Sequence, residues 1–301
     1  MFKKKKKTGT PLEASEKVMI VISYIIMSIL ALCAILPILH VLSKSFSSAS
    51  AVTSGSVLFW PVDIQFETMK YVLKETTFLH SLKNTIIVTV VGTIISMVVT
   101  ITTAYPLSKP SFKGRKVFIM LYIISMVFFG GIIPAYMVVR TLGIIDTFAA
   151  LILPFFIVHF NMFIVKNYFE GLPESIEESA KIDGASDIRI LISIVCPMST
   201  PVLATVAMLY AVNYWNNYFH AVMYTNSTEM QTLQLFTFNT ISNTQTIVER
   251  LVAGNYSNVS IDGIVSAVVV LSLIPIVALY HWFRDIWFKV LPLAQSKVNQ
   301  I

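Results

Sequence analysis

The sequence predicts an all-α polytopic membrane protein, and this class rests on its composition, on six long apolar stretches and on the positions of its few charges. Of the 301 residues, 55% are hydrophobic and 13% are charged, and the mean hydropathy is +0.74. Soluble domains carry about 25% charged residues, so this composition argues against a soluble enzyme. Its apolar content also excludes a disordered chain. Backbone groups in lipid must be hydrogen-bonded within their own segment, which makes the stretches helices, and the alternation typical of a transmembrane barrel is absent.

Six stretches are free of Asp, Glu, Lys and Arg, and each has about the 20 residues that a helix needs to cross a bilayer. Gly130, Gly131 and Pro134 indicate a kink or close packing within the third stretch. We predict transmembrane helices over residues 18–42, 84–107, 117–139, 147–165, 201–224 and 263–283. The connecting segments are a basic tail over 1–17, an outer loop over 43–83, turns at 108–116 and 140–146, an inner loop over 166–200, an outer loop over 225–262 and an inner tail over 284–301.

The charges outside these stretches predict the orientation. If the N-terminus lies inside, 16 of the 22 Lys and Arg residues fall in inner segments and 6 in outer ones. Because Lys and Arg concentrate on the cytoplasmic side, we expect both termini in the cytoplasm and interpret the net charge of +6 as topology, with no role in nucleic-acid binding. The basic tail also suits anionic membrane lipid. A cleaved signal peptide is the alternative for the first stretch, but the apolar core of a signal spans about 7–15 residues, so we expect a retained anchor.

The inner loop over 166–200 departs from the basic pattern, because it holds six acidic and three basic residues. Pro173 suits the first turn of a helix, and Gly184 suits a left-handed stop. The Ser186-Asp187 pair suits the start of a second helix. The loop is therefore predicted to form a helix, a glycine turn and a second helix. The alternative interpretation is an amphipathic connector with a solvated acidic face.

This loop resembles the E-A-A-x-x-x-G loop of the permease subunits of bacterial ABC importers, including its later I-x-L-P element. Two positions depart mildly from the pattern, because Ser179 replaces the first Ala and Cys196 replaces the Leu. The positions that fall at the matching spacing are Glu178, Ser179, Ala180, Gly184, Ile194 and Pro197. With Asp183 and Ala185 the segment also resembles the fuller form E-x-A-x-x-D-G-A of sugar-importer permeases.

The resemblance covers most of the chain. The six-span layout, the segments 66–71 and 81–85 and the triplet Tyr214-Trp215-Asn216 are similar to the second permease of maltose-type carbohydrate importers, and within that group to permeases for complex oligosaccharides. The tail over 293–298 departs from the Gly-rich ending of those relatives, so its contacts with the ATPase stay open.

The resemblance implies a type I ABC importer permease core in the bacterial cell membrane. The 174–185 segment would be the coupling helix, with Glu178 contacting the ATPase and Gly184 allowing the turn. The implied partners are a second permease in a heterodimer, two cytoplasmic ATPase subunits, an extracytoplasmic solute-binding protein and a sugar substrate. Because the chain has no G-x-x-x-x-G-K-[ST] phosphate loop, we expect that it does not hydrolyse ATP. We also expect that it is not an enzyme and has no catalytic residue and no metal or cofactor of its own. ATP and Mg would be bound by the partner ATPase.

The fifth stretch holds the candidate substrate path. Sugar sites combine amide hydrogen bonds with aromatic stacking, and polar residues inside a span usually face the protein interior or a water-filled path. Four polar residues of this stretch share one helix face at i, i+3, i+4 and i+7 spacing, namely Asn213, Asn216, Asn217 and His220. The alternative is hydrogen bonding between helices of the bundle. The candidates are Asn213, Trp215, Asn216, Asn217 and His220.

Other polar positions carry weaker expectations. His40, His159 and Asn161 lie in spans and are more often structural than path-lining. By analogy with the relatives, the binding protein would contact Ala253, Gly254 and Asn255.

The alternatives are the same machine moving a non-sugar solute such as a peptide or an anion, a secondary carrier, and an integral membrane enzyme. The spans lack the counter-charge that an ion path needs. They also show no internal inverted repeat typical of a carrier, and the five histidines are scattered. A neutral, polar cargo is therefore predicted.

Overall fold

The computed structural model describes residues 14–128, 130–243, 245, 248–249, 251 and 258–298, and within these residues the regular structure is helical, with no strand. The chain divides into two compact units. One unit comprises Met1–Lys70 and Val248–Val270, and the other comprises Tyr71–Ile247 and Leu271–Ile301. Two helices, α3 (Glu67–Lys74) and α16 (Ile261–Val298), run from one unit into the other.

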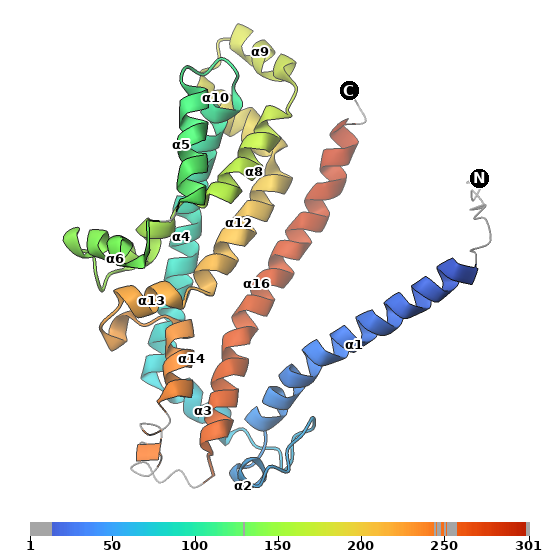
Figure 1. Ribbon diagram of the computed structural model, residues 1–301, viewed down its shortest axis with the longest axis vertical. Helices are drawn as coiled ribbons and strands as arrows, with labels where there is room; N and C mark the ends of the chain where they lie inside the picture. Colours follow the sequence, from blue (N-terminus) through green and yellow to red (C-terminus); the bar gives the residue numbers. More distant parts are fainter. Residues whose placement is uncertain are drawn as a thin grey trace. The chain divides into compact units, whose positions relative to one another are not determined.

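The first unit contains the long helix α1 (Ala14–Ser45) and the short helix α2 (Ala49–Thr53). The apolar side chains along α1 are exposed, as expected of a helix whose surroundings are lipid or another chain. The segment after α1 folds back on its end, where the Gln65 N–H donates to the Phe46 carbonyl at 2.8 Å. This bond fixes the path of the segment after α1 (Figure 1).

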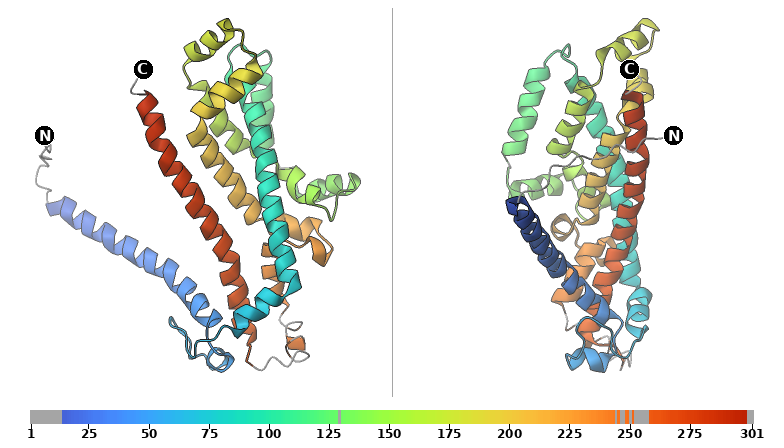
Figure 2. Two further views of the ribbon diagram at one scale, coloured as in Figure 1. Left: turned by 180° about the vertical axis from the view of Figure 1, so that it is seen from behind. Right: turned by 90° about the vertical axis from the view of Figure 1, so that its right-hand side faces the viewer.

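The core of the second unit is formed by α4 (Thr76–Ser108), α8 (His159–Glu170) and α12 (Thr200–Trp215), which pack against one another along α4 (Figures 1 and 2). Small residues on α4 allow this close packing. A Cβ at Gly92 would lie 2.7 Å from the Tyr214 ring of α12, which is closer than side chains tolerate. The approach of α12 to α4 therefore requires glycine at this position.

Two predicted spans are bent in the structure. The 117–139 stretch becomes α5 (Arg115–Val127) and α6 (Ile132–Thr141), which are inclined at 113°. Gly131 takes φ +96° here, in agreement with the kink expected from the glycines. The 147–165 stretch becomes α7 (Phe148–Ile152), the 3₁₀ turn η1 (Leu153–Phe155) and α8, with a bend of 53°. Pro154 lies in η1, and its missing N–H disfavours a continuous helix.

The 201–224 stretch is also interrupted. Helix α12 ends at Trp215, three residues follow without helical structure, and α13 covers Phe219–Tyr224. At its start, α12 meets the preceding helical segment at 86°. Among the described residues, three helices are suited by length and composition to cross a membrane, and the count reaches six if each bent pair forms one span.

Hydroxyl groups from α12 satisfy the backbone at the break between α7 and α8. The Tyr210 hydroxyl accepts from the Val158 N–H at 3.1 Å and also bonds to the Thr100 hydroxyl of α4 at 2.7 Å. One turn away, the Tyr214 hydroxyl bonds to Ser96 at 2.9 Å and donates to the Ile152 carbonyl at 3.4 Å. Because lipid offers no hydrogen bonds, a broken span depends on such internal partners.

The remaining short helices lie between α8 and α12 and after α13 in the chain. The short π-helix η2 inserts an extra residue into a turn, a feature often found near functional segments. These elements are α9 (Glu174–Ile182), α10 (Asp187–Ile190), η2 (Leu191–Val195), α11 (Cys196–Met198), η3 (Thr228–Met230) and α14 (Leu233–Ser242).

Candidate functional site

The predicted helix, glycine turn and second helix are confirmed in the 166–200 loop. Helix α9 ends at Ile182, and Gly184 follows in the left-handed conformation with φ +79°. The N–H of Gly184 donates to the Lys181 carbonyl and that of Ala185 to the Ala180 carbonyl, each at 3.0 Å. This pattern is a Schellman motif, which explains why a glycine is needed there.

Two details of that prediction are corrected. The first helix stops at Ile182 and does not reach residue 185, because the Schellman motif closes it before the turn. Pro173 is the residue before the helix and not part of its first turn. Ser186 caps α10 as expected, its hydroxyl accepting from the Arg189 N–H at 3.4 Å.

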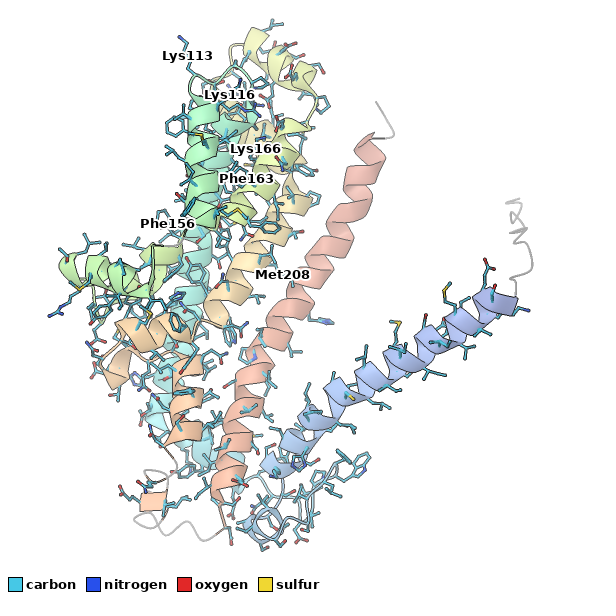
Figure 3. All side chains as sticks on the ribbon, in the orientation of Figure 1. Lys113, Lys116, Phe156, Phe163, Lys166 and Met208 are labelled. Atoms are coloured by element: carbon cyan, nitrogen blue, oxygen red, sulfur yellow. The ribbon has the colours of Figure 1, made fainter. Side chains whose placement is uncertain are left out.

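Helices α9 and α10 lie at one end of the second unit (Figures 1 and 2). Their outer surface combines acidic and apolar groups, because Glu178 is exposed together with Ile182 at 87% and Ile188 at 72%. Lys113 and Lys116 lie at the same end (Figure 3). Two isoleucines with most of their surface exposed favour contact with another protein surface. The family pattern does not include these two isoleucines, although an isoleucine beside the predicted turn is a usable signal of an exposed contact.

The predicted coupling residues divide by exposure. Ala180 and Ala185 are half-buried and pack against the core, so they position the turn. The exposed members are Glu178, Ser179, Asp183, Gly184 and Pro197.

The neighbouring acid, Glu177, points the other way. Its side chain is buried, and its carboxylate forms an ion pair with Lys109, the residue directly after α4. The Tyr105 hydroxyl donates to the same carboxylate at 3.4 Å, and the Lys109 ammonium lies 4.9 Å from the centre of the Tyr105 ring. This ion pair was not predictable from local sequence, because Lys109 and Glu177 are 68 residues apart.

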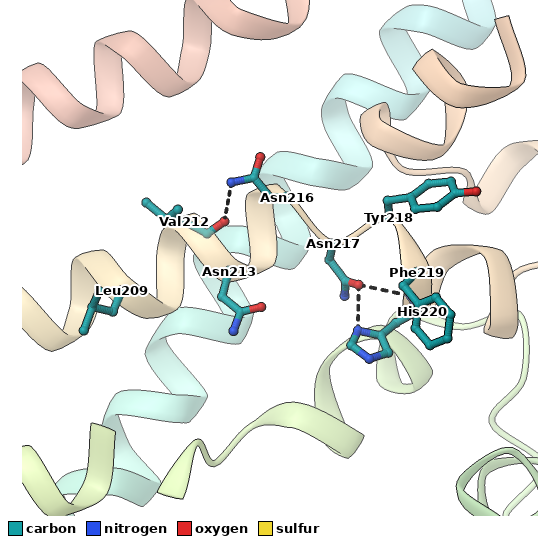
Figure 4. A pocket seen from close by; sticks show the side chains of 8 residues that line it. All are labelled: Leu209, Val212, Asn213, Asn216, Asn217, Tyr218, Phe219 and His220. Carbon is teal, nitrogen blue, oxygen red and sulfur yellow. Dashed lines mark hydrogen bonds between the residues drawn. The ribbon is translucent and has the colours of Figure 1, made fainter. Parts of the chain in front are cut away.

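A cavity lies where α12 ends and α13 begins. The cavity measures about 310 Å³. Amides and aromatic rings line it, and its exposed amides are those of Asn213 and Asn216 (Figure 4). The lining residues are Leu209, Val212, Asn213, Asn216, Asn217, Tyr218, Phe219 and His220.

Hydrogen bonds hold part of this lining in place. The side-chain oxygen Oδ1 of Asn217 accepts from the His220 backbone N–H at 3.3 Å and bonds to the ring Nδ1 of His220 at 2.8 Å (Figure 4). The His220 ring stacks on Phe155, with ring centroids 3.3 Å apart. Four of the five predicted path residues thus meet at one cavity, although the helix between them is interrupted. Trp215 is the exception, because it is buried at 2% exposure and does not line the cavity.

The other polar positions have local partners. His40 Nδ1 donates to the Leu58 carbonyl at 2.7 Å, and the His159 ring packs edge-on against Tyr122 with centroids 5.7 Å apart. Asn161 is buried. The predicted binding-protein contacts Ala253, Gly254 and Asn255 lie outside the described residues.

Asp146 forms a clamp in the turn after α6. Its Oδ1 accepts from the N–H groups of Asn226 at 3.0 Å and Ser227 at 3.1 Å, and from the Ser227 hydroxyl at 3.1 Å. These bonds, led by that from the Ser227 backbone, hold the pKa of the carboxyl below its usual range. Asp146 has φ +61°, which an Asp tolerates better than most residues.

Comparison with known proteins identifies the class. Residues 110–289 match the family described as binding-protein-dependent transport system inner membrane component. The chain belongs to this family. It is 41% identical over 260 residues to the protein LplC of Bacillus subtilis, covering 85% of this chain and 86% of LplC. It is also 35% identical to the polygalacturonan/rhamnogalacturonan transport system permease YtcP of the same organism, covering 86% and 91% of the two chains.

Solved structures agree with this assignment. A chain of a bacterial ABC transporter involved in the import of the acidic polysaccharide alginate matches with a TM-score of 0.86 and 34% identity, covering 92% of this chain and 99% of that chain. A chain of a bacterial alginate ABC transporter in complex with its pentasaccharide-bound periplasmic protein matches with a TM-score of 0.55 at 13% identity, which supports the fold alone.

These matches confirm the predicted family, the all-α importer-permease fold and the membrane location. The expected function, a permease subunit of the sugar-importer class, is confirmed at the level of this family and its relatives. A transport subunit, and not an enzyme, is what the family describes.

Proposed function

We propose that this chain is one of two different permease subunits of an ATP-driven importer for a neutral oligosaccharide. In this proposal, two cytoplasmic ATPase subunits bind and hydrolyse ATP with Mg, and an extracytoplasmic solute-binding protein delivers the sugar. Both termini and α9 face the cytoplasm. The names of relatives support the sugar class, since one carries polygalacturonan or rhamnogalacturonan and another arabinooligosaccharides.

The amide-lined cavity carries this proposal. Asn213 is exposed on the mostly apolar helix α12, and Asn216 is exposed directly after its last residue. Amides exposed to hydrocarbon are costly. Such groups favour a water-filled path or a polar partner. Amide donors and acceptors beside Tyr218 and Phe219 suit sugar hydroxyls and the apolar faces of sugar rings.

The absence of charge around the cavity supports a neutral cargo. Its lining contains amides, aliphatic groups, aromatic rings and one histidine, and no Lys, Arg, Asp or Glu among the described lining residues. A uronic-acid chain would favour cationic partners. The proposed cargo therefore differs in charge from two acidic polysaccharides in the names of relatives, the alginate of the structural relative and the polygalacturonan of YtcP.

At the other end, the exposed surface of α9 and α10 supports the coupling role. Glu178, Ile182 and Ile188 form a mixed acidic and apolar surface on a short rigid helix. A rigid helix seated on an ATPase transmits a rigid-body motion to the bundle. Gly184 allows the tight turn that exposes this surface.

The test is uptake by the complete complex in proteoliposomes, with ATP at the cytoplasmic face and the binding protein outside. Neutral oligosaccharides and oligosaccharides of uronic acids are compared as substrates. The double variant Asn213→Leu and Asn216→Leu removes two amides, each worth about 1 kcal/mol in hydrogen bonding, and we expect uptake to fall about tenfold or more. Thr205→Val, which removes a hydroxyl elsewhere on α12, is the matched control and should leave uptake unchanged.

Unchanged uptake in the double variant would assign the amides to helix association. Uptake of uronic-acid chains alone would contradict the neutral cargo. Uptake of a neutral peptide and of no sugar would favour the non-sugar alternative.

A further inference from the structure

We infer that Glu177 is a positioning residue that makes α9 and α4 move as one body. This inference rests on the proposed function, because it concerns how motion of α9 reaches the transport path. The contact that would transmit this motion is the buried ion pair between Glu177 and Lys109, supported by the Tyr105 hydroxyl.

The covalent connections of α9 are poorly suited to transmit motion alone. Three residues, starting with Gly171, separate it from α8, and a link containing Gly184 in the left-handed conformation separates it from α10. Glycine places few restraints on the backbone. A helix held only by two such links would pivot when its outer surface is pushed.

The buried side of α9 supplies the missing restraint. Glu177 is 8% exposed and lies in the first turn of α9, while its two partners lie at the end of α4 and one residue beyond it. The ring of Tyr105 is itself held by an edge-on contact with Phe169 of α8, with centroids 6.4 Å apart. The buried Glu177 carboxylate depends on Lys109, because removing one partner of a buried ion pair leaves an uncompensated charge.

A second ionic contact fixes the other side of the link. Glu170, the last residue of α8, pairs with Arg115 at 2.5 Å and with Lys166. The Arg115 Nε donates in turn to the Leu107 carbonyl of α4 at 2.9 Å. Arg115, the first residue of α5, therefore connects the end of α8 to α4, next to the three-residue link between α8 and α9.

From α4 the contacts continue to the cavity. The α4 hydroxyls Ser96 and Thr100 bond to Tyr214 and Tyr210 of α12. Tyr214 is adjacent in sequence to Asn213 of the cavity. A chain of contacts shows only that coupling has a physical route, and a change in coupling has to be measured.

The experiment measures sugar taken up per ATP hydrolysed by the complete complex in proteoliposomes. Glu177→Gln leaves the exposed surface of α9 intact, so we expect ATP hydrolysis to continue while the uptake per ATP falls about fivefold or more, the lower range of coupling between sites. Glu174→Gln, which removes an exposed carboxylate from the same helix, is the matched control and should keep the wild-type ratio.

Exchange of the two charges separates positioning from simple destabilisation. The double variant Lys109→Glu and Glu177→Lys restores an ion pair, and we expect it to return the uptake per ATP to within about twofold of wild type. An unchanged ratio in Glu177→Gln, or a charge exchange that rescues assembly but not the ratio, would overturn the inference. If the wild-type complex itself took up no sugar, the proposed function would fail and not this inference.

A distance measurement decides the matter even if Glu177→Gln does not assemble. Spin labels at Glu174→Cys on α9 and Thr102→Cys on α4, with Cys33 and Cys196 replaced by Ser, report whether the helices move together. We expect the distance between the labels to stay constant between the nucleotide-free and ATP-bound complexes. A distance that changes with ATP would overturn the inference.

Discussion

Two regions along α4 hold their neighbours with different chemistry. At its end, Tyr105 and Lys109 bind α9 through the buried carboxylate of Glu177. Ser96 lies about 18 Å from Ser108, the last residue of α4, at the 1.5 Å rise per residue of an α-helix. It binds α12 through the hydroxyl of Tyr214. The first contact is ionic and the second is neutral.

The position of each contact explains this difference. A charge at the centre of a bilayer is costly, whereas charges near the ends of a bundle retain contact with water. Lys109 keeps 26% of its side chain exposed. Neutral hydroxyls satisfy backbone groups at a helix break without that cost, as Tyr210 does for Val158. Three substitutions test this contrast, in order of expected effect.

Lys109→Met should give the largest loss of stability, because it leaves the Glu177 carboxylate without its cation in a buried site. Breaking such a pair costs about 3–5 kcal/mol, and we expect about 3 kcal/mol because Lys109 is partly exposed. Thermal unfolding of the purified complex measures the effect as a fall in Tm. Lys113→Met, an exposed lysine in the same turn, is the control. Equal Tm values for the two variants would show that the ionic contact adds no stability.

Tyr210→Phe should have a smaller effect, because it removes a neutral group. It leaves the Val158 N–H and the Thr100 hydroxyl without a partner, and we expect a loss of about 2 kcal/mol. The same unfolding measurement applies, and Tyr122→Phe on α5 removes a hydroxyl outside this network as the control. If the loss exceeded that of Lys109→Met, the ranking of ionic above neutral contacts would be wrong.

Asp146→Asn should have the smallest effect, because the amide oxygen can still accept the bonds from Asn226 and Ser227 and only the charge is lost. The carboxyl pKa is lowered in the folded protein, so its contribution is present above the pKa of the unfolded chain and is lost as the pH falls through the lowered pKa.

The Tm of wild type should therefore exceed that of Asp146→Asn by about 2 °C or less at pH 7, and the difference should shrink as the pH falls below about 4. A difference that is constant between pH 7 and pH 3 would show that the charge of Asp146 does not stabilise the turn.

The sequence predicted local structure well where one short segment carries the whole signal. Pro173, Gly184 and Ser186 mark the start, the stop and the next cap of the α9 segment, and all three act through their own backbone or nearest neighbours. The apolar stretches likewise predict the membrane class, since span length and charge are local properties.

The breaks in the spans were harder to predict. The glycine pair Gly130-Gly131 predicts a kink or close packing, and the structure bends there. The end of α12 at Trp215 had no proline or glycine to mark it, so the sequence predicted one helix over 201–224. The predicted amides still meet at one cavity, because the break is only three residues long, and Asn217 within it bonds to His220.

The sequence by itself thus determined the membrane class, the importer-permease family and the turn that ends α9, because each depends on residues close together in the chain. Only the tertiary structure decided which of two adjacent acids is exposed. Glu178 lies on the outer surface, and Glu177 is buried against Lys109. The reason is that burial depends on the partner that the fold brings near, and here that partner comes from the end of α4.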